Sequence, residues 1–151
     1  MNKIILKKNI FDLYSVLKFR GTPLDALADF LIRDSLQAFD EANFEESFFI
    51  KWLEDRKLEN GRTGGNTMDM EKRGKRVYIG SQFREKREDV SECFSTTTLN
   101  MIRILRQWYS ILAMNPLPDE VHLVQEGDEV LIVPKFTLCE DMVTGSVLLK
   151  A

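Results

Sequence analysis

One stretch of the sequence, residues 95–114, limits the possible folds more than any other. Its apolar side chains recur three and four positions apart, which is the spacing of an amphipathic helix. One stripe is formed by Leu99, Ile102, Leu105, Tyr109 and Leu112, and it is widened by Met101, Ile104, Trp108 and Ile111. Because this face is so broad, we expect the helix, over about residues 96–114, to be buried on more than one side. Any of the hydroxyl residues 95–97 can cap its start, and residues 115–118, with two prolines, end it.

A second helix is predicted over about residues 23–39, where apolar side chains again recur at helical spacing. Thr22 can cap this helix, and Pro23 suits its first turn. Residues 10–19, which precede it, fit either a strand or a helix, and the choice stays open.

Two segments alternate between apolar and polar side chains on both sides of a turn, as β-hairpins do. One covers residues 67–80, with its turn at residues 73–74, and the other covers residues 119–134, with its turn at residues 126–128. Pro134 indicates an edge strand or a strand end, because proline cannot donate a hydrogen bond to a neighbouring strand.

The remaining segments are short. The aromatic side chains of residues 47–55 fit both the alternation of a strand and the spacing of a helix, and their aromatic content favours a strand. Residues 59–66 contain three glycines and no large apolar side chain, which predicts a mobile loop. Further short strands are expected at residues 3–6, 91–94 and 146–149.

Helices and strands follow one another without the regular spacing of βαβ units, so the predicted fold class is α+β. We expect a single domain over residues 1–151, in which an antiparallel sheet of hairpins packs against two main helices, about 23–39 and 96–114. A chain of 151 residues normally buries roughly 70% of its unfolded surface, so this domain needs neither a disulfide nor a metal to hold it together.

The sequence also bears on the cellular compartment. No apolar run approaches the roughly 18–20 residues that cross a bilayer, and the N-terminus has only a short apolar core, too short for a secretion signal. These features predict a cytoplasmic protein with no membrane partner. Cys93 and Cys139 can form a disulfide, but a reducing cytosol favours two buried thiols.

The residue types needed for catalysis or metal binding are scarce. His122 is the only histidine, and it falls in a predicted strand, where an ordinary surface role is far commoner than that of a catalytic base. One histidine and two cysteines without close spacing do not make a zinc site. The glycine-rich residues 61–65 lack the lysine and hydroxyl residue that end a phosphate loop. We therefore predict no catalytic residue, no cofactor and no metal, in a protein that is not an enzyme.

Charge is distributed unevenly along the chain. The basic residues 72–76 are the nearest feature to a nucleic-acid-binding patch, but the isoelectric point of about 5.3 disfavours nucleic acid as a partner. Residues 22–50 contain seven acids and one arginine, and residues 115–151 contain seven acids and two lysines. Such stretches can steer a charged partner, although a fold that mixes the signs over a solvated surface is equally compatible.

Three features of the second half of the chain form a pattern. They are residues 76–80 (RVYIG), a helix over residues 99–112 that contains Arg106, Gln107 and Trp108, and residues 118–121 leading into a terminal hairpin. Together they resemble small bacterial immunity proteins, particularly those paired with the toxins of contact-dependent growth inhibition. The resemblance covers about residues 76–134 and implies a cytoplasmic protein that binds and neutralises a cognate toxin domain.

Such toxins are often nucleases with basic substrate grooves. An acidic surface on the immunity protein would complement the charge of such a groove. With a basic toxin as the partner, the partner-binding candidates are two acidic segments. One is a turn expected to project from the fold, with Glu126, Asp128 and Glu129; the other has no lysine or arginine to offset it, with Asp40, Glu41, Glu45 and Glu46. A non-catalytic protein-interaction or adaptor domain of unrelated role is the alternative.

Overall fold

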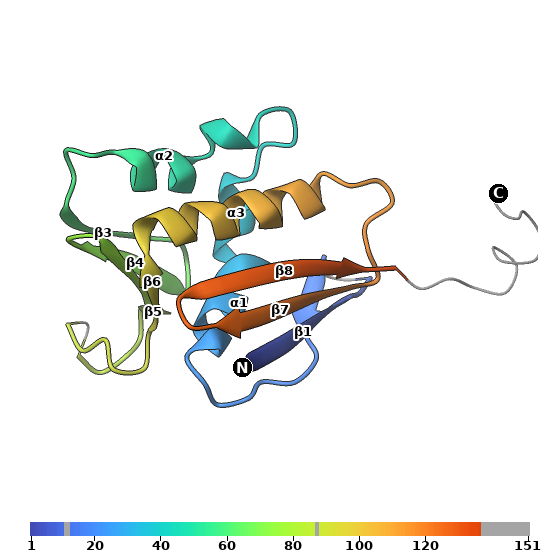
Figure 1. Cartoon of the computed structure of the whole chain (residues 1–151), viewed down its shortest axis with the longest axis horizontal. Coiled ribbons are helices and arrows are strands. Elements are labelled where there is room, and N and C mark those ends of the chain that lie inside the picture. The colour runs from blue at the N-terminus through green and yellow to red at the C-terminus, as the bar shows by residue number, and fades with distance from the viewer. Residues whose placement is uncertain (11–12, 87, 137–151) are drawn as a thin grey trace, which may run out of the picture.

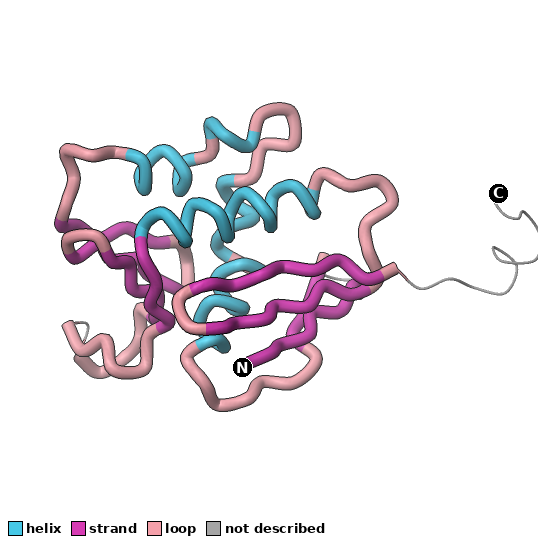
Figure 2. Tube along the Cα trace, viewed as in Figure 1, coloured by secondary structure: helices cyan, strands magenta, loops and turns pink. Residues whose placement is uncertain are grey.

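The computed structural model of the protein describes residues 1–10, 13–86 and 88–136, which form two four-stranded antiparallel sheets and three α-helices (Figures 1 and 2). The first sheet has the order β2-β1-β7-β8, with β1 at Asn2–Lys8, β2 at Tyr14–Val16, β7 at Glu120–Glu126 and β8 at Glu129–Lys135. The second has the order β3-β4-β5-β6, with β3 at Asn60–Gly64, β4 at Met68–Arg73, β5 at Arg76–Ser81 and β6 at Phe94–Thr97. The helices are α1 at Leu24–Ile32, α2 at Phe48–Glu54 and α3 at Thr98–Leu112. The predicted α+β class is confirmed, with two sheets in place of one.

Helix α3 occupies the core, as its broad apolar face predicts. Trp108 and Tyr109 are fully buried. The indole Nε1 of Trp108 donates a hydrogen bond to Ser35 Oγ at 3.0 Å, and the Tyr109 hydroxyl donates to the Ser35 carbonyl oxygen at 2.9 Å. Of the three candidate caps, the structure uses Thr97, whose Oγ1 accepts the N–H of Asn100 at 3.1 Å.

The two sheets are joined through α1 and α3. Helix α1 contacts β1 and β2 of the first sheet and β4, β5 and β6 of the second, while α3 contacts β8, β5 and β6. In Figure 1, α1 lies behind β7 and β8, and α3 runs along the β8 edge. Pro134 lies in β8, which is an edge strand, so this prediction is also confirmed.

The predicted second helix is shorter than expected. It ends at Ile32, and a 3₁₀ turn follows at Asp34–Ala38. Thr22 does not cap α1, and its Oγ1 has no hydrogen-bond partner among the described residues. The carboxylate of Asp25, in the first turn of α1, instead fixes the segment that leads into the helix. It accepts the backbone N–H groups of Arg20 and Gly21 at 3.1 and 2.8 Å.

The strand favoured for residues 47–55 is wrong, because these residues form α2. Its carbonyl end is held by Lys72 of β4, whose Nζ donates to the carbonyl oxygens of Trp52, Asp55 and Leu58 at 2.7, 3.1 and 3.1 Å. A cation at the C-terminal end of a helix is favoured by the helix dipole. The lysine arrives from a distant strand, so no local pattern reveals it.

The loop expected at residues 59–66 is also wrong, since β3 pairs with β4 there. The buried carboxylate of Asp34 organises the turn between these strands by accepting the N–H groups of Asn66 and Met68 at 3.1 and 2.6 Å. A Cβ at Gly65 would lie 2.5 Å from Asp34 Cγ, so the close approach requires glycine. Of the three glycines, Gly61 and Gly64 lie within β3, and only Gly65 lies in the turn that follows.

The remaining predictions concern short segments and membrane-spanning helices. The expected strand at 91–94 is β6, displaced towards Thr97, and the undecided residues 10–19 contain β2. The expected strand at 146–149 and Cys139 lie outside the described residues. None of the described helices has the length and hydropathy needed to cross a bilayer.

Candidate functional site

The turn between β7 and β8 does not project freely. The Arg76 guanidinium donates two hydrogen bonds of 3.0 Å to the Asp128 carboxylate, and this bonding lowers the pKa of Asp128. The carbonyl oxygen of Asp128 accepts from Thr96 Oγ1 at 2.6 Å and from Asn100 Nδ2 at 3.2 Å. Asp128 therefore fastens the turn to the second sheet and to α3.

Glu126 and Glu129 are placed differently. They are exposed and lie directly opposite each other in the β7–β8 pairing. Neither has an ion-pair partner among the described residues. Like charges opposite each other in a sheet repel, so this carboxylate pair is a site that a cationic group would stabilise.

The second acidic segment is largely neutralised. Arg106 of α3 binds Glu45 at 2.9 Å, and Lys51 of α2 binds Glu46 at 2.9 Å. Asp40 accepts the N–H of Ala42 at 3.0 Å, while Glu41 is exposed. The expectation that no base offsets this segment is wrong, because the folded chain supplies Arg106 from a distant helix. Figure 1 places the segment above α3 and the β7–β8 turn below it, so the two acidic groups lie apart.

The first sheet carries a surface that the sequence reasoning missed. Alternate side chains of β1, β7 and β8 point into the core: Ile4, Leu6, Val121, Leu123, Val130 and Ile132. The side chains between them point the other way, and several of these are also apolar: Ile5, Val124, Leu131 and Val133, around His122. In Figure 1 this side faces the viewer, and no described helix covers it. We call it the outer face.

The strand register makes the outer face continuous. His122 lies opposite Ile5 on one side and Val133 on the other, and Val124 lies opposite Leu131. The side chain of Leu131 is 60% exposed. A half-solvated antiparallel sheet normally carries polar residues here, so the apolar outer face is a candidate contact surface. Residues 130–133 are four consecutive apolar residues, which is the sequence signal for a strand that is apolar on both sides.

The alternation also assigns the carboxylates of the turn. Glu126 has the same parity as Val124, and Glu129 has the same parity as Leu131, so both belong to the outer face. Lysines lie on the same face further along the strands, at Lys3, Lys7 and Lys135. The outer face is therefore an apolar centre with an acidic end at the β7–β8 turn, and its other end carries Glu120 between Lys7 and Lys135.

His122 lies in this apolar centre and not on a polar face. Its Nε2 is 3.0 Å from Glu120 Oε1, and its side chain is only 13% exposed. Cys93 lies next to the other sheet, at the start of β6. The structure thus does not bring the histidine and this thiol together as a nucleophile and its base.

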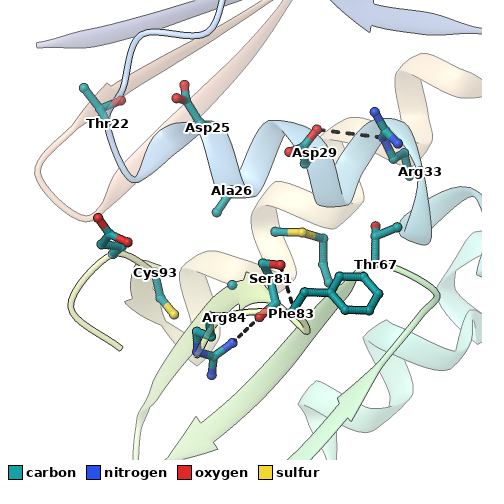
Figure 3. A pocket seen from close by; sticks show the side chains of 13 residues that line it. Thr22, Asp25, Ala26, Asp29, Arg33, Thr67, Ser81, Phe83, Arg84 and Cys93 are labelled. Atoms are coloured by element: carbon teal, nitrogen blue, oxygen red, sulfur yellow. Dashed lines mark hydrogen bonds and ion pairs between the residues drawn. The ribbon is translucent and has the colours of Figure 1, made fainter. Parts of the chain in front are cut away.

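A pocket of about 420 Å³ lies between α1 and the end of β5 (Figure 3). Several of its charged side chains are engaged in contacts within the protein. Arg84 binds Asp69 at 2.9 Å and the Ser81 carbonyl oxygen at 2.8 Å, and Arg33 lies 3.8 Å from Asp29. Burial raises the pKa of Asp29.

Cys93 lines the same pocket as a buried thiol. Burial raises its pKa, so the thiol stays protonated at neutral pH and is a poor nucleophile. A Cβ at Gly80 would lie 2.5 Å from the Cys93 sulfur, which shows how closely the thiol is packed. Among the described residues, no group of three or more histidine, cysteine, aspartate or glutamate side chains could hold a metal ion.

Comparison with protein-family models, with curated proteins and with solved structures finds no match for this chain. What the protein does must therefore be inferred from its own residues.

Proposed function

We propose that this protein is an immunity protein, which binds a cognate toxin domain in the cytoplasm and neutralises it without chemistry of its own. One observation carries the proposal: the outer face of the first sheet has an apolar centre, in which Leu131 is exposed and Ile5, Val124 and Val133 are half-buried, and no described helix covers it. Monomeric proteins rarely leave such a surface open unless another molecule covers it.

The chemistry of the outer face favours a protein partner. Burying a large apolar side chain such as Leu131 contributes about 1.5–3 kcal/mol. The opposed carboxylates of Glu126 and Glu129 at one end favour a lysine or arginine of the partner, because a cation there relieves their mutual repulsion. A nuclease toxin with a basic groove offers such side chains. Apolar contact would then hold the complex, and the acidic end would speed its formation.

A protein-interaction or adaptor domain of unrelated role is the second candidate. It would use the same outer face, since the surface does not depend on what the partner does. The two functions differ in whether the partner is toxic and in whether binding abolishes that toxicity.

Co-expression tests the proposal directly. The toxic domain encoded beside this chain's gene should stop growth, and the wild-type chain should restore it. Leu131→Lys should abolish protection, because it places a charge in the apolar centre. Phe48→Lys is the matched control and should leave protection intact, since Phe48 is a similarly exposed apolar residue on α2, at 54% against 60% for Leu131.

Thermal denaturation of both variants checks that they remain folded. If the wild-type chain gives no protection, the immunity function is wrong. If Leu131→Lys protects as well as wild type, the outer face is not the toxin-binding surface.

A further inference from the structure

The function proposed above does not use a second surface of the protein, a groove beside the first turns of α3. Two hollows of about 680 and 430 Å³ lie where the end of α2, the β4–β5 turn and the first turns of α3 meet. Both are lined by Leu53, Arg56, Thr98 and Leu99, so they form one continuous groove. We call it the α2–α3 groove.

The lining of the groove includes several leucines. Leu53 and Leu58 line the end near α2, and Leu99 lies between the two hollows. Leu99 belongs to the apolar stripe predicted for α3, yet its side chain is 69% exposed. The buried part of α3 begins at Met101, and the exposed Leu99 precedes it and faces the groove.

Cations line the rim, and one of them, Arg103, donates a hydrogen bond to Asn100 Oδ1 at 3.4 Å. Arg56, Lys75 and Arg103 line the groove, and none has an ion pair within the described part of the chain. Of the acids nearby, Glu54 binds Arg106 at 3.1 Å, whereas Asp55 accepts, among the described groups, only the backbone N–H of Lys57 at 3.0 Å and keeps its charge.

Asp55 and Glu59 are the two lining acids without an ion pair to another described residue. The three cations named above and Lys72 outnumber these two carboxylates, which makes the groove a site for negative charge.

One wall of the groove is held in place by hydrogen bonds from Lys72. Lys72 is 3% exposed and fixes residues 52–58 through its three hydrogen bonds to carbonyl oxygens. Its Nζ also lies 4.9 Å from the centre of the Trp52 ring, within the range of a cation–π contact. Because the groove is already formed, little of the binding free energy is lost to ordering it.

We propose that the α2–α3 groove binds an acidic segment of a partner protein that also carries leucine-like side chains. Carboxylates of the segment contact Arg56, Lys75 and Arg103, and its apolar side chains pack on Leu99. Nucleic acid fits less well, because none of the described aromatic side chains lines either hollow for bases to stack on. The site is separate from the outer face, so it stands whether or not the partner there is a toxin.

The probe is a fluorescein-labelled twelve-residue peptide of glutamate and glycine with two leucines, titrated into the whole chain while amide resonances are followed by NMR. We expect shifts at the amides of Leu99, Lys75 and Arg56. Binding should be at least about tenfold tighter than for the same peptide with lysines in place of glutamates. Replacing its leucines by glycine should also weaken it.

Charge reversal locates the site. Lys75→Glu with Arg103→Glu should weaken binding of the glutamate peptide by about tenfold or more. Lys7→Glu with Lys135→Glu makes the same change of charge on the outer face and should leave binding unchanged.

Three results would overturn the proposal. One is the absence of groove shifts with the glutamate peptide at about 1 mM, a weak but measurable affinity range. Another is equal weakening by the two double variants. The third is tighter binding of a single-stranded twelve-nucleotide DNA at the same amides, which would assign the groove to nucleic acid.

Discussion

The side-chain amide of Gln107 pairs with the backbone of Ile132 on the edge strand β8. Gln107 Oε1 accepts the Ile132 N–H at 3.0 Å, and Gln107 Nε2 donates to the Val130 carbonyl oxygen at 3.2 Å. These are backbone groups that an added strand would use, and Pro134 has no N–H to offer. Because α3 closes this edge, the surface of the first sheet that remains open is its outer face.

The first prediction concerns this closure. Gln107→Ala should lower the free energy of unfolding by about 1–3 kcal/mol, since it leaves an N–H and a carbonyl group without their partner. It should also promote self-association through β8, measured by size-exclusion chromatography. Gln37→Ala, at an exposed position, is the control and should change stability by less than about 0.5 kcal/mol. Equal urea midpoints for the two variants would show that Gln107 does not protect the edge.

The second prediction concerns the core. Leu105 and Trp108 are fully buried, so Leu105→Ala and Trp108→Ala should each cost about 2–5 kcal/mol of stability through the cavity left behind. Leu99→Ala removes an exposed leucine of the same helix and should cost far less. Unchanged denaturation midpoints for both core variants would contradict the placement of α3.

The elements that the sequence predicts correctly share a physical origin. Helix α3 and the hairpins β4–β5 and β7–β8 are defined by periodicity within a few turns or strands, which a single sequence displays. The misjudged elements depend on distant partners. Lys72 binds a carbonyl oxygen at the C-terminal end of α2. Asp34, packed against Gly65, accepts a backbone N–H of the turn between β3 and β4.

The same reasoning applies to the candidate site. Glu126 and Glu129 stay available, as expected from a hairpin turn, but Asp128 and Glu45 do not. Arg76 and Arg106 reach them across 52 and 61 residues of sequence. The sequence shows which residues of a segment are acidic. It does not show which distant basic residues pair with them once the chain is folded.

The third prediction uses pH. Burial alone would raise the pKa of Glu71, but hydrogen bonds from Arg73 and Arg62 outweigh it and lower the pKa below the usual 4.5. A carboxyl group with a lowered pKa in the folded state contributes stability above its unfolded pKa. That contribution is lost as the pH falls through the folded value.

The variant Glu71→Gln isolates this effect. Urea denaturation should show wild type more stable by about 1 kcal/mol at pH 7, with the difference constant down to about pH 5. Below pH 4.5 the difference should shrink as Glu71 of the wild type becomes protonated. A difference that does not depend on pH would mean that the ion pairs of Glu71 contribute nothing.

The last prediction concerns how the partner approaches. Glu126 and Glu129 lie on the outer face without an ion-pair partner among the described residues, so Glu126→Lys with Glu129→Lys should slow association with the cognate toxin domain by about tenfold at low salt. The difference should shrink as salt rises towards about 1 M, where screening acts within about 3 Å. Stopped-flow mixing at both salt concentrations measures it. Asp128 is left unchanged, because its bond to Arg76 fastens the turn.

The control separates the two acidic segments. Asp40→Lys with Glu41→Lys makes the same change of charge on the far side of α3 and should leave the association rate unaltered. If this control slows association and the Glu126/Glu129 variant does not, the partner approaches the segment before α2, and the outer face loses its role. If neither variant slows association, the free carboxylates do not steer the partner, and the apolar contact at Leu131 must carry recognition without them.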